Sequence, residues 1–232
     1  MHLPSSFRKI PTSLSVTDKP STVNELSAAL NVRREFNLPG APEPYLNDIV
    51  RVFRLAKGKK TYVEVGTRDK GNIAWLARDV LANDAVIVDI DVESYPGQER
   101  KLRASLQPKQ QYHCLTGNSI DIATVNIVKK IVGDRGADVI FCDTLHTFQH
   151  TLSEFDAYYP ILADGGVIIF HDCYFENNGS EPKGKSIGLA QVDRMVPVYA
   201  VFADEPTHRH LPRETNKPVW GGSAVIIKEK AA

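Results

Sequence analysis

The chain has none of the long apolar runs that mark membrane proteins or exported precursors. Its longest strongly apolar stretches, 167–170 and 198–203, fall far short of the roughly 18–20 residues that a membrane span needs. The N-terminal segment has no apolar core of the kind found in a secretory signal. We therefore expect a protein that neither crosses a membrane nor has a membrane partner.

Cysteine is scarce and net charge is absent. Cys114, Cys142 and Cys173 are widely spaced and form no CxxC pair, which argues against a disulfide framework and fits a reducing compartment. Lys and Arg number 28 and Asp and Glu number 28, so the surplus of positive charge that a protein uses to coat nucleic acid is missing. We expect a cytoplasmic protein with no nucleic-acid partner.

The length and composition suit one domain with an extension. The chain has 232 residues, 42% of them hydrophobic and 24% charged, which is enough to bury a full core. Residues 1–44 are interpreted as an N-terminal extension, with a short helix at 22–31 opened by a capping box at Thr22 and Glu25 and then a proline-rich linker. Residues 45–232 are expected to form the main domain.

The main domain alternates strand and helix patterns. The first five strand candidates are 62–65, 85–88, 111–115, 137–142 and 166–170. Their continuous apolar character predicts a parallel sheet that helices cover on both faces. Two more strands, 198–202 and 223–227, follow with no helix between them and predict one antiparallel edge strand. The expected fold class is α/β, with a seven-stranded, mostly parallel sheet and an N-terminal helical extension.

Polar residues or glycines follow each of the five parallel strands. Ligands of open parallel sheets bind at that edge, so these residues are the candidates for a site. The first turn is not a dinucleotide fingerprint, because GxGxxG needs glycine where this chain has Arg68. The strand-end residues are Glu64, Gly66, Thr67, Gly71 and Asn72, then Asp89 and Asp91, Asn118 and Ser119, Asp143 and His146, and His171 and Asp172.

Three segments resemble one family. The run Val63-Glu64-Val65-Gly66-Thr67 resembles motif I of the class I, Rossmann-like methyltransferases that use S-adenosyl-L-methionine (SAM). An Asp-x-x-His in 138–146 and a Gly-Gly strand ending in His-Asp in 159–172 resemble small bacterial O-methyltransferases related to macrocin-type sugar O-methyltransferases and cephalosporin-hydroxylase-like proteins. The segment 220–227 is similar to that family's last, antiparallel strand. The resemblance extends over about 45–228 and implies SAM-dependent methyl transfer to a hydroxyl oxygen of a small molecule, such as a sugar or natural product.

The resemblance also implies a cofactor site. Gly66 would let the backbone approach the methionine part of SAM, and Glu64 would lie at its amino end. Asp89 or Asp91 would accept the ribose hydroxyls, and the spacing does not decide between them. Lys70 stands where relatives often have glycine. The implied cofactor-binding residues are Glu64, Gly66, Thr67, Gly71, Asn72, Asp89, Asp91, Asn118 and Ser119, with the last two near the adenine.

A second group of residues would act on the acceptor. Asp143, His171 and Asp172 are candidate ligands of a divalent cation, Mg²⁺ or Mn²⁺, that would acidify the acceptor hydroxyl. Without a metal, Asp143 would only order the pocket. Asp143 and His146 are the catalytic candidates, with His146 as general base. His150 is expected on the solvent face of its helix, opposite an apolar stripe at 148, 152, 155 and 159.

Other interpretations stay open. Asp143, His171 and Asp172 would also suit a metal-dependent hydrolase or oxygenase. A SAM- or nucleotide-binding module without catalysis is a third interpretation. The loops 173–185 and 204–218 are expected to shape the acceptor site, and the basic second loop is equally a solvated loop or a subunit contact in a homo-oligomer.

Overall fold

One sheet forms the centre of the molecule. The computed structural model describes residues 22–36, 50, 53–145, 147–176, 198–202 and 219–229, without the side chains of 148, 172–176, 198–202 and 219–222. The strands are β1 (Thr61–Val65), β2 (Val86–Asp91), β3 (Gln111–Thr116), β4 (Ala137–Cys142), β5 (Leu162–Glu176), β6 (Val198–Phe202) and β7 (Val219–Ile227). The helices are α1 (Val23–Phe36), α3 (Gly71–Asp79), α4 (Pro96–Ser105), α5 (Ile122–Val132) and α6 (Phe148–Tyr158), with short 3-10 turns η2 (Arg54–Ala56) and η3 (Tyr159–Ile161).

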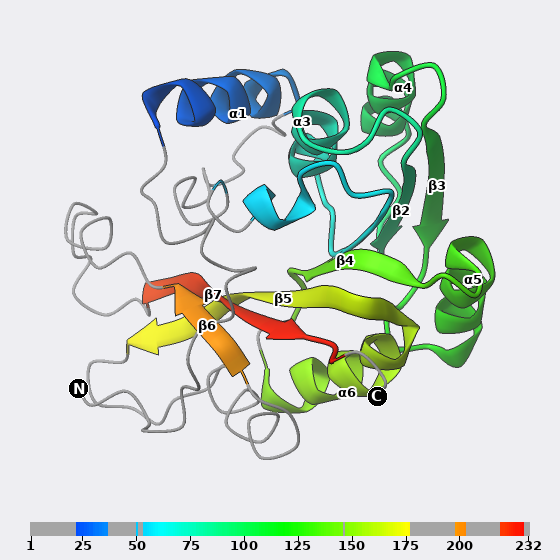
Figure 1. Ribbon diagram of the computed structural model, residues 1–232, viewed down its shortest axis with the longest axis vertical. Coiled ribbons are helices and arrows are strands. Elements are labelled where there is room, and N and C mark those ends of the chain that lie inside the picture. Colours follow the sequence, from blue (N-terminus) through cyan, green and yellow to red (C-terminus); the bar gives the residue numbers. More distant parts are fainter. Residues whose placement is uncertain are drawn as a thin grey trace.

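The strand order is β3-β2-β1-β4-β5-β7-β6, which confirms the expected α/β fold class (Figure 1). Strands β1 to β5 run parallel, and β7 runs antiparallel to both of its neighbours. The antiparallel strand lies one position in from the edge, because β6 pairs along its outer side. The carboxyl ends of β1, β2, β3, β4 and β5 therefore meet at one edge of the sheet.

Helices cover both faces of the sheet, with α1, α3 and α4 on one side and α5 and α6 on the other (Figure 1). The strands alternate between the two cores. Tyr62, Ile87 and Phe141 pack under α1 and α3, whereas Val63 and Ile140 pack under α5 and α6. Because parallel central strands are buried on both faces, their sequences are apolar throughout.

The N-terminal helix α1 is part of this packing. Its capping box is confirmed, since Thr22 N donates to Glu25 Oε2 at 2.8 Å and Glu25 N donates to Thr22 Oγ1 at 3.2 Å. The helix continues beyond the expected end near residue 31 to Phe36, because Val32 and Phe36 bury their side chains in the core shared with α3. In α3, Trp75 packs near this layer, against Phe53 at 5.8 Å between ring centroids.

Some sequence predictions fall outside the described residues. These are residues 177–185 of the first acceptor-site loop and all of the second loop at 204–218. Within the described part of the chain, no helix has the length and apolarity to cross a membrane.

Candidate functional site

The turn after β1 joins three strand ends. Gly66 has φ +86°, a conformation that side chains disfavour, and a Cβ atom there would lie 2.1 Å from the carbonyl oxygen of Asp143. Gly66 N donates to Ile90 O, and Asp143 N donates to Val65 O, each at 2.8 Å. The absence of a side chain at Gly66 therefore brings the ends of β1, β2 and β4 into direct contact.

Glu64 is a buried carboxyl group in the middle of this edge, with 1% of its surface exposed. Tyr62 OH donates to Oε2 at 2.5 Å, and Asn72 Nδ2 donates to Oε1 at 3.3 Å. Burial raises the pKa of Glu64 to about 8, and the negative charges of Asp89 and Asp143 act in the same direction. A cationic ligand beside Glu64 would relieve both the burial and the repulsion.

Asp89 is fully buried and is held by donors from the protein itself. Lys70 Nζ lies 2.5 Å from its Oδ2. The hydroxyls of Tyr112 and Thr67 also donate to this carboxylate. Lys70 has φ +66°, the region that favours glycine, and its side chain is 1% exposed. The Lys70 ammonium group is thus buried beside Asp89 and neutralises the charge of its carboxylate.

Asp91, unlike the buried Asp89, can accept hydrogen bonds from a ligand. It ends β2 half-buried, and its two oxygens accept backbone donors from Arg68 N at 2.7 Å and Glu93 N at 2.9 Å. A carboxylate has about four lone-pair sites, so Asp91 keeps capacity for further donors. Of the two aspartates that the sequence left open, Asp91 has the geometry to meet ribose hydroxyls.

The two candidate residues that follow β3, Asn118 and Ser119, differ in their exposure to solvent. Asn118 is exposed, and its Oδ1 accepts from Ile120 N at 3.2 Å. Ser119 is buried, and its hydroxyl donates to Glu154 Oε1 at 3.1 Å and lies 3.3 Å from His150 Nε2. Asn118 is thus open to a ligand, whereas Ser119 belongs to an internal network.

The expectation that His150 faces solvent is wrong. Its side chain is 12% exposed and its Nε2 lies 3.2 Å from Glu154 Oε1, which also accepts from Thr144 Oγ1 at 2.6 Å. The reason is that the inner face of α6 is partly polar, with Thr151 and Glu154 fully buried. Sequence reasoning assumed an apolar inner face and so missed Glu154. The polar residues facing it at 119 and 144 were the available signal.

Asp143 and His171 lie side by side after β4 and within β5. His171 Nδ1 is 3.2 Å from Asp143 Oδ1, and the side chains are 4% and 28% exposed respectively. His146 and the side chain of Asp172 lie outside the described residues. Within the part of the chain that the structure describes, no three His, Cys, Asp or Glu side chains gather as a metal site would require.

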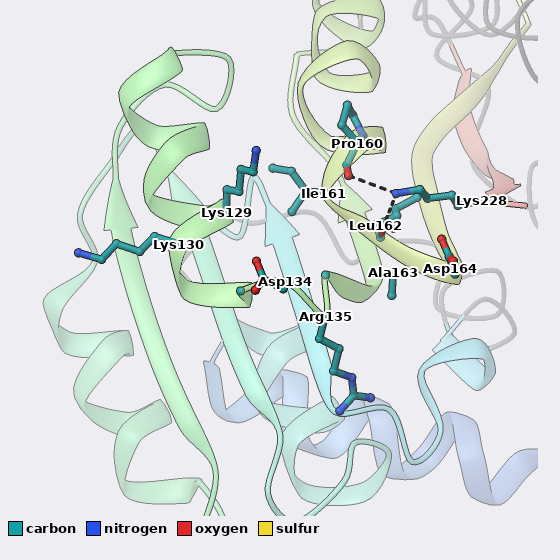
Figure 2. Close-up of a pocket in the computed structure, with 12 residues that line it drawn as sticks. Lys129, Lys130, Asp134, Arg135, Pro160, Ile161, Leu162, Ala163, Asp164 and Lys228 are labelled. Atoms are coloured by element: carbon teal, nitrogen blue, oxygen red, sulfur yellow. Dashed lines mark hydrogen bonds between the residues drawn. The ribbon is translucent and has the colours of Figure 1, made fainter. Parts of the chain in front are cut away.

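A separate cavity of about 630 Å³ lies at the opposite end of the sheet, near the amino ends of β4 and β5. Figure 2 shows Lys228 reaching the carbonyl oxygens of Pro160 and Leu162, at 3.2 and 2.6 Å, while Lys130 extends away from them. None of the strand-end residues named above lines this cavity. The predicted site and the cavity are therefore distinct.

The residues at the carboxyl edge fit SAM by charge. Glu64, Asp91 and Asp143 place three acidic side chains around the Gly66 turn, and SAM carries two positively charged groups, its ammonium and its sulfonium. The side chains that donate hydrogen bonds to Glu64 are neutral, namely the Tyr62 hydroxyl and the Asn72 amide. Because neutral donors compensate a buried carboxylate only in part, its pKa stays raised, and an ammonium ion is the complementary ligand.

Residues 63–173 match the family model described as a methyltransferase domain. The chain has the fold of the class I, Rossmann-like methyltransferases. A curated relative, the uncharacterized protein R132 of Acanthamoeba polyphaga mimivirus, is 27% identical over 126 residues. That match covers 50% of this chain and 52% of the relative, so the chain spans about half the length of the curated relative it matches.

Solved structures share the fold at low sequence identity. The O-methyltransferase TomG of Streptomyces achromogenes, involved in tomaymycin synthesis and solved with SAM, is 18% identical with a TM-score of 0.59, over 91% of this chain and 92% of that one. An O-methyltransferase from Bacillus cereus, solved with SAH (S-adenosylhomocysteine), is 15% identical with a TM-score of 0.55, over 90% and 92%. MycE of the mycinamycin pathway, solved with Mg and SAH, is 15% identical with a TM-score of 0.53, over 88% and 55%.

Proposed function

We propose that this protein is a SAM-dependent methyltransferase that acts on a hydroxyl oxygen of a small molecule, such as a sugar or a natural product. The observation that carries the proposal is the Asp143–His171 pair at the strand-end edge, 3.2 Å apart and next to the Gly66 turn. An alcohol is a weak nucleophile until its proton is removed, and a carboxylate–imidazole pair supplies a proton acceptor. The similar structures named as O-methyltransferases support the same acceptor atom.

In this proposal, different residues bind the parts of SAM and activate the acceptor. Glu64 binds the amino group of SAM, Asp91 accepts the ribose hydroxyls, and Asn118 lies toward the adenine. SAM supplies a methyl group on a positively charged sulfur, so no covalent intermediate with the protein is needed. Asp143, 28% exposed, meets the acceptor hydroxyl, and the Asp143–His171 pair takes its proton as the oxygen–methyl bond forms and the sulfur–methyl bond breaks. Holding the two reactants in line is worth roughly 7–11 kcal/mol.

A panel of acceptors tests the proposal. Protein would be incubated with SAM carrying a labelled methyl group and with sugars, phenols, amines and RNA, and the label followed into product. We expect label in hydroxyl compounds and its loss in Asp143→Asn. The control is Asp164→Asn, an exposed aspartate at the opposite cavity, which should leave transfer intact. Label confined to amines or RNA would overturn the hydroxyl proposal.

Chelation tests whether a divalent cation takes part in the proposed methyl transfer. Asp143, His171 and Asp172 are the residues that would hold Mg²⁺ or Mn²⁺, and such an ion would lower the pKa of the bound hydroxyl. If the ion takes part, EDTA abolishes transfer and added Mg²⁺ or Mn²⁺ restores it, while SAH affinity stays the same. Full transfer in EDTA would leave the Asp143–His171 pair, or His146, as the base.

A further inference from the structure

Helix α1 places a buried arginine against the start of α3. Arg33 is 8% exposed. Gly71, the first residue of α3, lies close against Arg33, since a Cβ at Gly71 would lie 3.2 Å from Asp69 Oδ1, 3.3 Å from Arg33 Cγ and 3.4 Å from Arg33 Cα. The backbone of α1 thus rests directly on the turn that leads from Gly66 into α3. Residue 33 lies outside the segment 63–173 that matches the methyltransferase family.

Arg33 fixes the orientation of Asn72. Its Nη1 donates to Asn72 Oδ1, and Asn72 Nδ2 donates to Glu64 Oε1 at 3.3 Å. A guanidinium group has donors only, so it forces the amide oxygen toward itself and the amide nitrogen toward Glu64. Because Tyr62 OH occupies the other oxygen of Glu64, the carboxyl group is held on both sides.

We propose that Arg33 is a positioning residue for the amino-acid end of SAM, acting through Asn72 on Glu64. The inference rests on the proposed cofactor site. Arg33 places the Glu64 oxygens for the ammonium group, and its positive charge favours the neighbouring carboxylate of the ligand. The adenosine half of SAM is assigned to Asp91 and Asn118, which lie on other strand ends. Arg33 should therefore affect only those ligands that carry an amino-acid group.

Two ligands separate this role from a general structural one. SAH carries the amino-acid group, whereas 5′-methylthioadenosine shares its adenosine and lacks that group. In Arg33→Met the side chain keeps its packing volume and loses its donors. Calorimetry should show that this change weakens SAH binding tenfold or more and leaves methylthioadenosine binding within twofold. Arg33→Lys keeps a donor-only cation and should recover a substantial part of the SAH affinity.

The matched control is Arg78, which also joins α3 to α1 but does so through Glu35, at 2.8 and 3.2 Å. Arg78→Met should leave both affinities unchanged. Equal weakening of both ligands in Arg33→Met, or an unchanged SAH affinity, would overturn the inference while the parent still binds SAH. If the parent binds neither ligand, the cofactor assignment itself fails and the role of Arg33 fails with it. Should Arg33→Met not fold, the ratio of the two affinities in Arg33→Lys separates the same outcomes.

Discussion

The absence of a side chain at Gly66 should matter for both stability and SAH binding. Gly58 and Gly66 both have positive φ, but only Gly66 has backbone within reach of a Cβ atom. We expect Gly58→Ala to cost about 1–2 kcal/mol for backbone strain alone. Gly66→Ala adds a clash with Asp143 and should cost about 3–5 kcal/mol, with loss of SAH binding. Urea unfolding measures both, and equal costs would contradict the close approach.

The two aspartates of β2 should differ in what they support. Asp89→Asn leaves the buried ammonium of Lys70 without its charged partner and should cost about 3–5 kcal/mol of unfolding free energy. Asp91→Asn should change stability by less than about 1 kcal/mol and weaken SAH binding about tenfold, the effect of one hydrogen bond to a charged group. Denaturation and calorimetry on both variants test this, and the reverse pattern would reassign the ribose site to Asp89.

Glu64 should make stability depend on pH. Its pKa is raised from 4.5 to about 8 in the folded protein, so between these values the folded state binds more protons than the unfolded state. Stability from this group is therefore full below pH 4.5 and falls as pH rises toward 8. In urea unfolding at about pH 5.5 and about pH 8, the parent should lose more stability than Glu64→Gln. Parallel losses would show that Glu64 ionises normally.

The inner face of α6 is not a simple apolar stripe, since Thr151 and Glu154 are buried on it. Thr151 Oγ1 is buried with no hydrogen-bond partner among the described residues, whereas Thr144 Oγ1 donates to Glu154. Thr151→Val keeps the shape and removes an unsatisfied group, so we expect stability to rise by about 1 kcal/mol. Thr144→Val should lower it by about 1–2 kcal/mol. A loss in both variants would show that the Thr151 hydroxyl has a partner.

The predicted and the observed elements differ where tertiary contacts decide the structure. Strands β1, β4 and β5 were predictable because continuous apolar runs reveal doubly buried strands. The inner face of α6 was not, because the buried Glu154 accepts hydrogen bonds from Thr144 and Ser119, which come from loops that follow other strands. Likewise α1 continues to Phe36 because tertiary burial outweighs the local end signals.

For the molecule as a whole, the boundary expected after residue 44 separates α1 from the core it helps to build. Ala29, Val32 and Phe36 pack in one cluster with Tyr62 and Ile73. Removal of residues 1–44 should therefore lower the urea midpoint of the remaining 45–232 chain well below that of the parent. An unchanged midpoint would show that the extension folds and unfolds independently.

The site was predictable in outline, because the strand ends that carry it follow from the fold. Glu64, Gly66, Asp91 and Asp143 do lie at one edge of the sheet. What the sequence could not reveal are pairings that depend on side-chain direction. Lys70 forms an ion pair with Asp89. Arg33 donates a hydrogen bond to Asn72, which lies 39 residues further along the chain. No local pattern encodes either contact.

The charge at this edge has a consequence for turnover. In the proposed site, Glu64, Asp91 and Asp143 would face a ligand with two positive groups before transfer. After transfer the sulfur is a neutral thioether, and one positive group remains. The same carboxylates that attract the donor therefore hold the product less firmly. In the proposed site, methyl transfer thus removes one of the charges by which the acidic edge attracts its ligand, so the reaction itself should favour release of the spent ligand.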